Sequence, residues 1–127
     1  MPIKTTQDKG QNLTTHVVTG LIVEEEMYKA LDVFYEHYNT PLLLWDMSEA
    51  EMDNVTPEML RNFIRKAAKI GVRRRDGKTA VVAISDLQYG FGRMSEMLFE
   101  LESGPFSFRV FRSRQDAMAW LTSDTSS

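Results

Sequence analysis

The sequence contains no cysteine and no long apolar run, and each absence excludes a class of structure. Without cysteine the chain has no disulfide, no thiolate zinc site and no cysteine nucleophile. No segment approaches the roughly 18 consecutive apolar residues of a membrane-spanning helix, and residues 1–12 lack the apolar core of a signal peptide. We therefore expect a cytoplasmic protein of bacterial type with no stable membrane insertion.

An excess of basic charge is also absent, since 15 Lys and Arg stand against 18 Asp and Glu, for a net charge of -3. Such a chain has no long-range attraction for nucleic acid, and we predict no nucleic-acid partner. Its 127 residues suit one hydrophobic core. We expect a single domain over residues 1–121 and a disordered polar tail at 122–127.

The spacing of apolar residues predicts strands and helices in alternation. A hairpin is expected from strands at 3–7 and 13–19, with Gly10 supplying a left-handed residue in the turn. A helix over 23–38 then leads to an apolar strand at 42–45 that ends at Asp46, and to a polar loop at 48–54. Thr56 and Pro57 have the residue types of a helix start, and Gly71 is placed to end that helix.

The second half repeats this alternation. A strand at 79–84, placed at the centre of the sheet, is followed by a helix with Met94, Met97, Leu98 and Leu101 on its core side. A strand near the sheet edge at 106–111 and a helix opened by Ser113 complete the pattern. Strands joined through helices pair in parallel, so the sequence predicts an α/β fold: a mixed, mostly parallel sheet of about five strands with four main helices.

Catalytic and metal-binding motifs are missing. His16 and His37 are the only imidazoles, and neither has a partner at metal-ligand spacing. No nucleophile elbow or P-loop occurs, and the segment Gly90-Phe91-Gly92 is best explained as a turn into a helix. We predict no enzyme, no metal and no cofactor.

Polar residues follow the two apolar strands. Asp46 ends one strand and Ser85-Asp86 follow the other, and ligands of parallel sheets bind at this edge. With Thr56, Tyr89 and Arg93 they form a candidate surface for a ligand or partner. The alternative is that these side chains only cap loops and helices.

Two further groups stand out. Seven of the fifteen basic residues lie between Arg65 and Lys78. They either stabilise a helix end or let Arg73, Arg74 and Arg75 contact an anion or a phospholipid headgroup. The eight methionines suit a core, but an apolar pocket is the alternative for one set of side chains: Met27, Tyr28, Phe91, Met94 and Met97.

Three segments carry a resemblance to a known family: Pro41 to Asp46, Lys78 to Gly90, and Val110 to Leu121. From Leu13 to Leu121 the chain resembles the SpoIIAA-like, or STAS/SEC14-type, small bacterial proteins. The resemblance implies a SpoIIAA-like β-α superhelix, shared by anti-sigma-factor antagonists and by lipid-carrying SEC14 domains. In the antagonists a phosphorylated serine opens the helix after the central strand, where this chain has Asp53 and Thr56.

Two functions follow from this resemblance. The leading hypothesis is a non-enzymatic STAS-like regulatory domain that binds a protein partner or forms a homodimer. The alternative is a small carrier or sensor of a lipid or other apolar ligand. The ligand would be small, because this chain is shorter than SEC14 proteins and lacks their helical gate.

Overall fold

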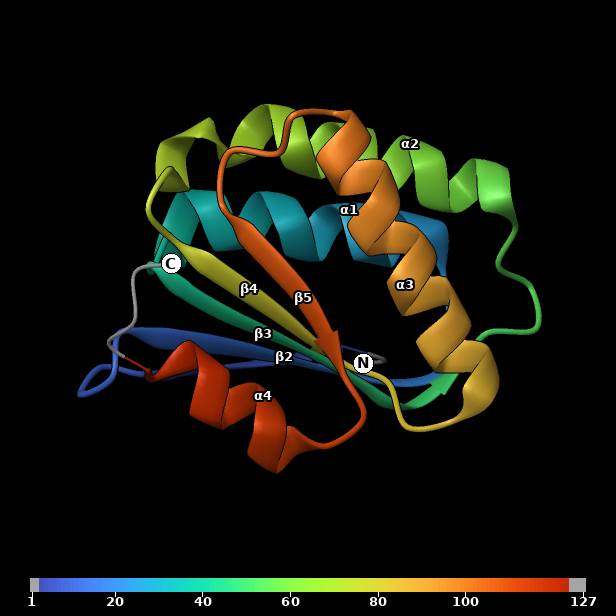
Figure 1. Cartoon of the computed structure of the whole chain (residues 1–127), viewed down its shortest axis with the longest axis horizontal. Helices are drawn as coiled ribbons and strands as arrows, with labels where there is room; N and C mark the ends of the chain where they lie inside the picture. Colours follow the sequence, from blue (N-terminus) through green and yellow to red (C-terminus); the bar gives the residue numbers. More distant parts are fainter. Residues whose placement is uncertain (1–2, 124–127) are drawn as a thin grey trace.

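A five-stranded sheet in the order β1-β2-β3-β4-β5 forms the middle layer of the molecule (Figure 1). The computed structural model describes residues 3–123, so most of the tail predicted at 122–127 lies outside the described residues. The strands are β1 (Ile3–Asp8), β2 (Leu13–Leu21), β3 (Leu42–Glu51), β4 (Lys78–Val82) and β5 (Ser107–Phe111). β1 is antiparallel to β2 and the other neighbours are parallel, which confirms the predicted α/β class and mixed sheet.

The helices are α1 (Glu24–Val33), α2 (Pro57–Ile70), α3 (Asp86–Leu101) and α4 (Arg114–Leu121), in the predicted order. α1, α2 and α3 cover one face of the sheet, and α4 covers the other (Figure 1). Thr56 caps α2 as predicted, since its Oγ1 accepts a hydrogen bond from the Met59 backbone N at 3.1 Å. Ser113 caps α4 in the same way.

The hairpin forms as predicted, but its left-handed residue is Asn12 and not Gly10. Asn12 has φ 53°, a conformation that asparagine tolerates better than most residues. The turn is also closed by Asp8, whose Oδ2 accepts from the Gln11 side chain at 2.8 Å. This hydrogen bond lowers the pKa of the exposed Asp8 carboxyl.

The strand that begins at Leu42 is longer than predicted and lies at the centre of the sheet. β3 continues to Glu51, beyond the end of β4, because its last residues pair with the end of β2. The prediction that it ends at Asp46 is therefore wrong, and so is the prediction that 48–54 is all loop. The central strand is β3, whereas β4 lies one place from the β5 edge.

The predicted core face of α3 is largely wrong. Leu98 is partly buried, but Met97 is 64% exposed, Leu101 is 78% exposed, and Met94 also faces outward. The buried residues of α3 are Gln88, Gly92, Ser95 and Phe99, of which two are small and one is aromatic. A Cβ on Gly92 would lie 2.4 Å from the Val110 side chain, so α3 approaches β5 closely only because this residue is glycine.

The end of α1 widens into a π-helical turn over Phe34–Tyr38. Its hydrogen bond from the Asn39 backbone N to the Phe34 carbonyl spans five residues and measures 2.7 Å. The turn buries two consecutive aromatic side chains, Phe34 and Tyr35, whose rings meet edge to face. Asn39, with φ 46°, then ends the helical segment.

The two faces of the sheet bury different side chains because residues alternate along each strand. Leu43, Trp45 and Met47 belong to the cluster under α1 and α2. Leu44 lies on the opposite face with the residues under α4, namely Leu13, Ala80, Val82, Ala117 and Leu121. The sheet thus separates two cores of different composition.

Candidate functional site

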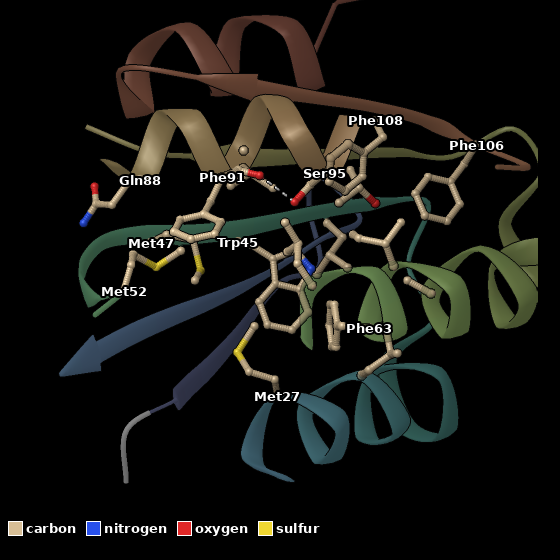
Figure 2. A pocket seen from close by; sticks show the side chains of 18 of the residues that line it. Met27, Trp45, Met47, Met52, Phe63, Gln88, Phe91, Ser95, Phe106 and Phe108 are labelled. Atoms are coloured by element: carbon tan, nitrogen blue, oxygen red, sulfur yellow. Dashed lines mark hydrogen bonds between the residues drawn. The ribbon is translucent and has the colours of Figure 1, made fainter. Parts of the chain in front are cut away.

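A cavity of about 90 Å³ lies between the sheet and the layer formed by α1, α2 and α3. Figure 2 shows its side chains pointing toward one another, with Met27 from α1, Phe63 from α2, Phe91 from α3 and Trp45 from β3. The exposed lining is almost wholly apolar. Such a space favours an apolar occupant over water, because water needs several polar partners.

A second space of about 70 Å³ adjoins the first, since five residues line both: Met27, Met47, Met52, Leu60 and Phe63. Met59 lines the second space as well. Thioether side chains are flexible and adapt to different shapes, so this methionine-rich boundary can open with little strain. Each space alone is smaller than the roughly 150 Å³ of a protein cavity that holds benzene, and the two would reach that size if their shared boundary opened.

One end of the first cavity is polar and is organised by Arg74. The guanidinium is 5% exposed and donates to three backbone carbonyls, those of Thr40, Pro41 and Lys78, at 2.9 to 3.0 Å. It also donates to the Thr79 hydroxyl at 3.0 Å and to the Tyr35 hydroxyl at 3.4 Å. Burial lowers the pKa of Arg74, and Tyr35 opposes this shift, yet the guanidinium remains charged.

The charge of Arg74 has no acidic partner. Among residues 3–123, no carboxylate lies within ion-pair distance of its guanidinium. The rings of Phe34 and Phe106 lie 5.1 and 4.7 Å from it and contribute cation–π attraction. A buried positive charge is therefore held by dipoles and aromatic rings alone.

The predicted contact of an arginine triplet with an anion does not hold for Arg74. Arg73 and Arg75 are exposed, whereas Arg74 turns inward from the short 3-10 helix over Gly71–Arg74. Gly71 opens this helix and lets the Phe106 ring approach closely, because a Cβ there would lie 2.4 Å from that ring. The sequence gives three equivalent arginines, and only the tertiary fold distinguishes the middle one.

Gln88 borders the other part of the cavity and was not predicted. Its Oε1 accepts from the backbone N of Ser85, and its Nε2 donates to the Ala50 carbonyl at 3.0 Å. Ser85 in turn caps α3 by accepting from the Gln88 backbone N. The Ser-x-x-Gln spacing of this capping box was the available sequence signal.

The predicted apolar pocket is partly right. Met27 and Phe91 line the cavity, whereas Tyr28, Met94 and Met97 are not among the lining residues. The prediction that Met94 and Met97 line the pocket is wrong, because α3 turns its small residues toward the cavity and these two methionines outward. Tyr28 instead packs beside the Phe63 ring at 5.5 Å.

The predicted polar surface is divided by the structure. Asp46 is buried on the α4 face, where its carboxylate accepts from the Ser48 hydroxyl at 2.6 Å and from Arg114 at 2.9 Å. Among the described hydrogen bonds, its link to Ser85 runs through Ser48 and Gln88. Asp46 thus stabilises β3 against α4 and is not an open ligand.

The exposed part of that surface is smaller. Asp86 pairs with Arg112 at 2.9 Å, and Arg112 lies 4.3 Å from the Tyr89 ring, so these side chains form one group. Arg93 pairs with Glu96 at 2.7 Å, and Glu96 also accepts from the Val110 backbone N at the sheet edge. Among the described hydrogen bonds, none joins Thr56 to the other predicted residues.

The two histidines lie in different environments. His37 is exposed beside Glu36, but His16 is fully buried against the Trp45 ring, with Nδ1 2.7 Å from the Thr5 hydroxyl. Burial lowers the pKa of His16 to about 4, so it is neutral at neutral pH. Within residues 3–123 no three acidic or histidine side chains are grouped as metal ligands would be.

Comparisons with solved structures show a likeness of fold, whereas comparisons with family models and curated proteins do not. No family model matches the chain, and no curated protein matches it. In the part of the chain that the structure describes, no helix has the length and apolarity needed to cross a membrane.

This chain is similar to the crystal structure of an uncharacterized protein from Shewanella loihica PV-4. That protein is from the DUF3478 family and has a SpoIIAA-like fold. The likeness covers 94% of this chain and 91% of that one, with a TM-score of 0.59 and 19% sequence identity. At this identity the likeness concerns the fold, and it agrees with the sheet order and the helical layers described above. The chain has a SpoIIAA-like α/β fold, as its sequence resemblance predicts.

Proposed function

We propose that this chain is a non-enzymatic binding domain that carries or senses a small apolar molecule. The observation that supports this proposal is the apolar cavity under α1, α2 and α3, with its methionine-rich extension. Ligand sites are concave, mainly apolar and supplied with a few polar groups, and this cavity has all three properties. Its size selects a molecule of about one aromatic ring, much smaller than a phospholipid.

A non-enzymatic role agrees with the polar groups around the cavity. In the described chain, both amide ends of Gln88 are bonded to the backbone, and the Arg74 donors are all occupied. Among the described residues, the lining of the first space contains no acid or histidine for proton transfer, and Glu24 lines the second space only. The exposed Arg73 and Arg75 provide the headgroup contact if the ligand is taken from a membrane.

The test uses Trp45, which lines the cavity, as a fluorescent reporter in a Trp120→Phe background. Toluene should change the Trp45 emission in a saturable way. Ala67→Leu, which fills the cavity from α2, should abolish this change, and Ala119→Leu on the exposed side of α4 should not. Equal responses of both variants, with intact circular dichroism, would show that the cavity is not the binding site.

A second candidate function, docking of a protein partner, is favoured by the outer face of α3. Leu87, Met94, Met97 and Leu101, here called the outer stripe, are exposed, and Ile84 precedes them. Leu87, Met94 and Leu101 recur every seven residues and so lie along one side of the helix. Asp86, Tyr89 and Arg93, from the predicted surface, supply polar groups on the same helix.

The two functions are compatible because α3 contacts the cavity with Phe91 and Ser95 and exposes the outer stripe on its other side. A second copy of the chain is the simplest partner for the outer stripe. Sedimentation velocity over a range of concentrations should detect a dimer that Met97→Glu removes and Gln115→Glu on α4 leaves intact. A chain that is monomeric at every concentration rules out this dimer.

A further inference from the structure

Tyr35 and Thr79 line the polar end of the cavity, and within residues 3–123 no acceptor is found for the hydrogen of either hydroxyl. The hydroxyls of Tyr35 and Thr79 both accept from Nη1 of Arg74, at 3.4 and 3.0 Å. In the described part of the chain, neither hydroxyl has a hydrogen-bond acceptor of its own. Both residues line the cavity, and they are 5% and 2% exposed.

Arg74 fixes the direction in which these hydroxyls act. Each hydroxyl oxygen uses a lone pair to accept from the guanidinium, so its hydrogen is directed elsewhere. The five N–H donors of Arg74 are themselves occupied by the three carbonyls and the two hydroxyls. Arg74 therefore does not bind a ligand directly, but orients two donors and supplies a positive charge behind them.

A buried charge without an acidic partner favours an anion nearby, because electrostatic interactions are strong where water is excluded. An oxygen that accepts from Tyr35 and Thr79 satisfies both free donors and also lowers the cost of burying the guanidinium. The remaining lining residues near this end, including Leu43, Phe106 and Phe108, are apolar. The site thus combines an apolar body with one anionic acceptor.

We infer that the cavity binds a small carboxylate whose apolar body, about one ring in size, lies among the methionines and aromatic rings and whose oxygen accepts from Tyr35 and Thr79. This inference rests on the proposed function and adds the chemical class of the ligand. Tyr35 and Thr79 are the specificity-determining residues, and Arg74 is a positioning residue. No proton transfer or covalent step is involved.

The test compares benzoate with toluene, which has the same ring and no oxygen, using Trp45 emission in the Trp120→Phe background. Tyr35→Phe and Thr79→Val each remove one hydroxyl and nearly preserve shape. Each should weaken benzoate binding about tenfold or more relative to toluene, the loss expected for a hydrogen bond to a charged group. Tyr28→Phe removes a phenol outside the cavity lining and should leave the ratio of the two affinities within about twofold.

The outcomes separate the two proposals. If toluene binds in the wild type and benzoate does not, the carboxylate inference is wrong and the apolar binding function stands. If both bind and neither variant changes their ratio, the assignment of Tyr35 and Thr79 is wrong. If neither probe binds, the proposed function and this inference both fail.

Discussion

The two faces of the sheet are packed differently, and the difference shows where the molecule keeps space for a ligand. Under α4 the buried cluster is wholly aliphatic and closely packed, with Leu44, Ala80 and Ala117 at 0% exposure. Under α1, α2 and α3 methionines and aromatic rings join the aliphatic residues and surround a cavity. Small branched residues fill a narrow layer completely, whereas long flexible residues leave a space whose shape can change.

The polar groups of the two faces differ in the same way. On the α4 face, Asp46 and Arg114 form a complete ion pair, and Lys78 donates to the Trp120 carbonyl at 3.0 Å. On the cavity face, within residues 3–123, Arg74 has no acidic partner and the Tyr35 and Thr79 hydroxyls have no acceptor for their hydrogens. The polar groups described on the α4 face have partners within the protein. Under our proposal, a ligand supplies the missing acceptor on the cavity face.

Removal of the Arg74 side chain should cause the largest loss of stability among these substitutions. Arg74→Met leaves the carbonyls of Thr40, Pro41 and Lys78 without their donors, and we expect a loss of about 4 kcal/mol in the free energy of unfolding. Urea denaturation measures this loss. Arg75→Met, an exposed neighbour, is the control and should change stability by less than about 0.5 kcal/mol. Equal effects would mean that the Arg74 network contributes little.

Truncation of one apolar residue on each face tests the packing difference directly. Leu44→Ala, on the α4 face, should cost about 3 to 4 kcal/mol because it opens a cavity in a filled layer. Met47→Ala should cost less, about 2 kcal/mol, since Met47 already borders both cavity spaces and has fewer contacts to lose. Thermal and urea unfolding measure both. The reverse order would contradict the contrast between the faces.

Acid should destabilise the cavity face through His16. Its pKa is lowered from 6.5 to about 4 in the folded protein, so the unfolded chain binds the extra proton first. The stability is therefore complete above pH 6.5 and is lost as the pH falls toward 4, by up to about 3 kcal/mol.

The free energy of unfolding, measured from pH 7 to pH 4, tests whether stability falls with the pH as predicted. His16→Gln should flatten the dependence because its side chain does not titrate. His37→Gln, which removes the exposed histidine, should leave the dependence as in the wild type. A steep acid loss that persists in His16→Gln would assign the effect to carboxyl groups.

The helix caps should give the smallest effects and the same effect on both faces. Thr56→Ala removes the cap of α2 on the cavity face, and Ser113→Ala removes the cap of α4. Each should cost about 1 kcal/mol in unfolding free energy. If Thr56→Ala leaves stability unchanged but abolishes binding of a partner, the role implied by the STAS resemblance replaces that of a cap.

Local signals explain which parts of the fold were predictable. Thr56 with Pro57, and Ser113 with Asp116, act within one helical turn, and both helix starts were predicted correctly. The extension of β3 was missed because Ser48 and Glu49 are polar residues in a strand segment that pairs with β2 beyond the end of β4. Its strand state depends on a partner that is remote in sequence.

The binding site was less predictable than the fold. The core side of α3 was misassigned because Gly92 and Ser95 face inward, and small residues carry a weak apolar signal. Arg74 could not be distinguished from Arg73 and Arg75, since its environment is built by Thr40, Pro41 and Phe106 from distant segments. Thr79, a hydroxyl within an apolar strand, was the available hint.

The π-helical turn at the end of α1 makes the position of the Tyr35 phenol depend on the length of this segment. Phe34 and Tyr35 are both buried in this turn. Asn39 ends it, and β3 begins at Leu42. Deletion of Phe34 would move Tyr35 to the position that Phe34 now occupies, so the phenol would leave its place beside Arg74. Under our proposal, such a shortened chain should keep the sheet and its helices and lose one of the two donors to the carboxylate.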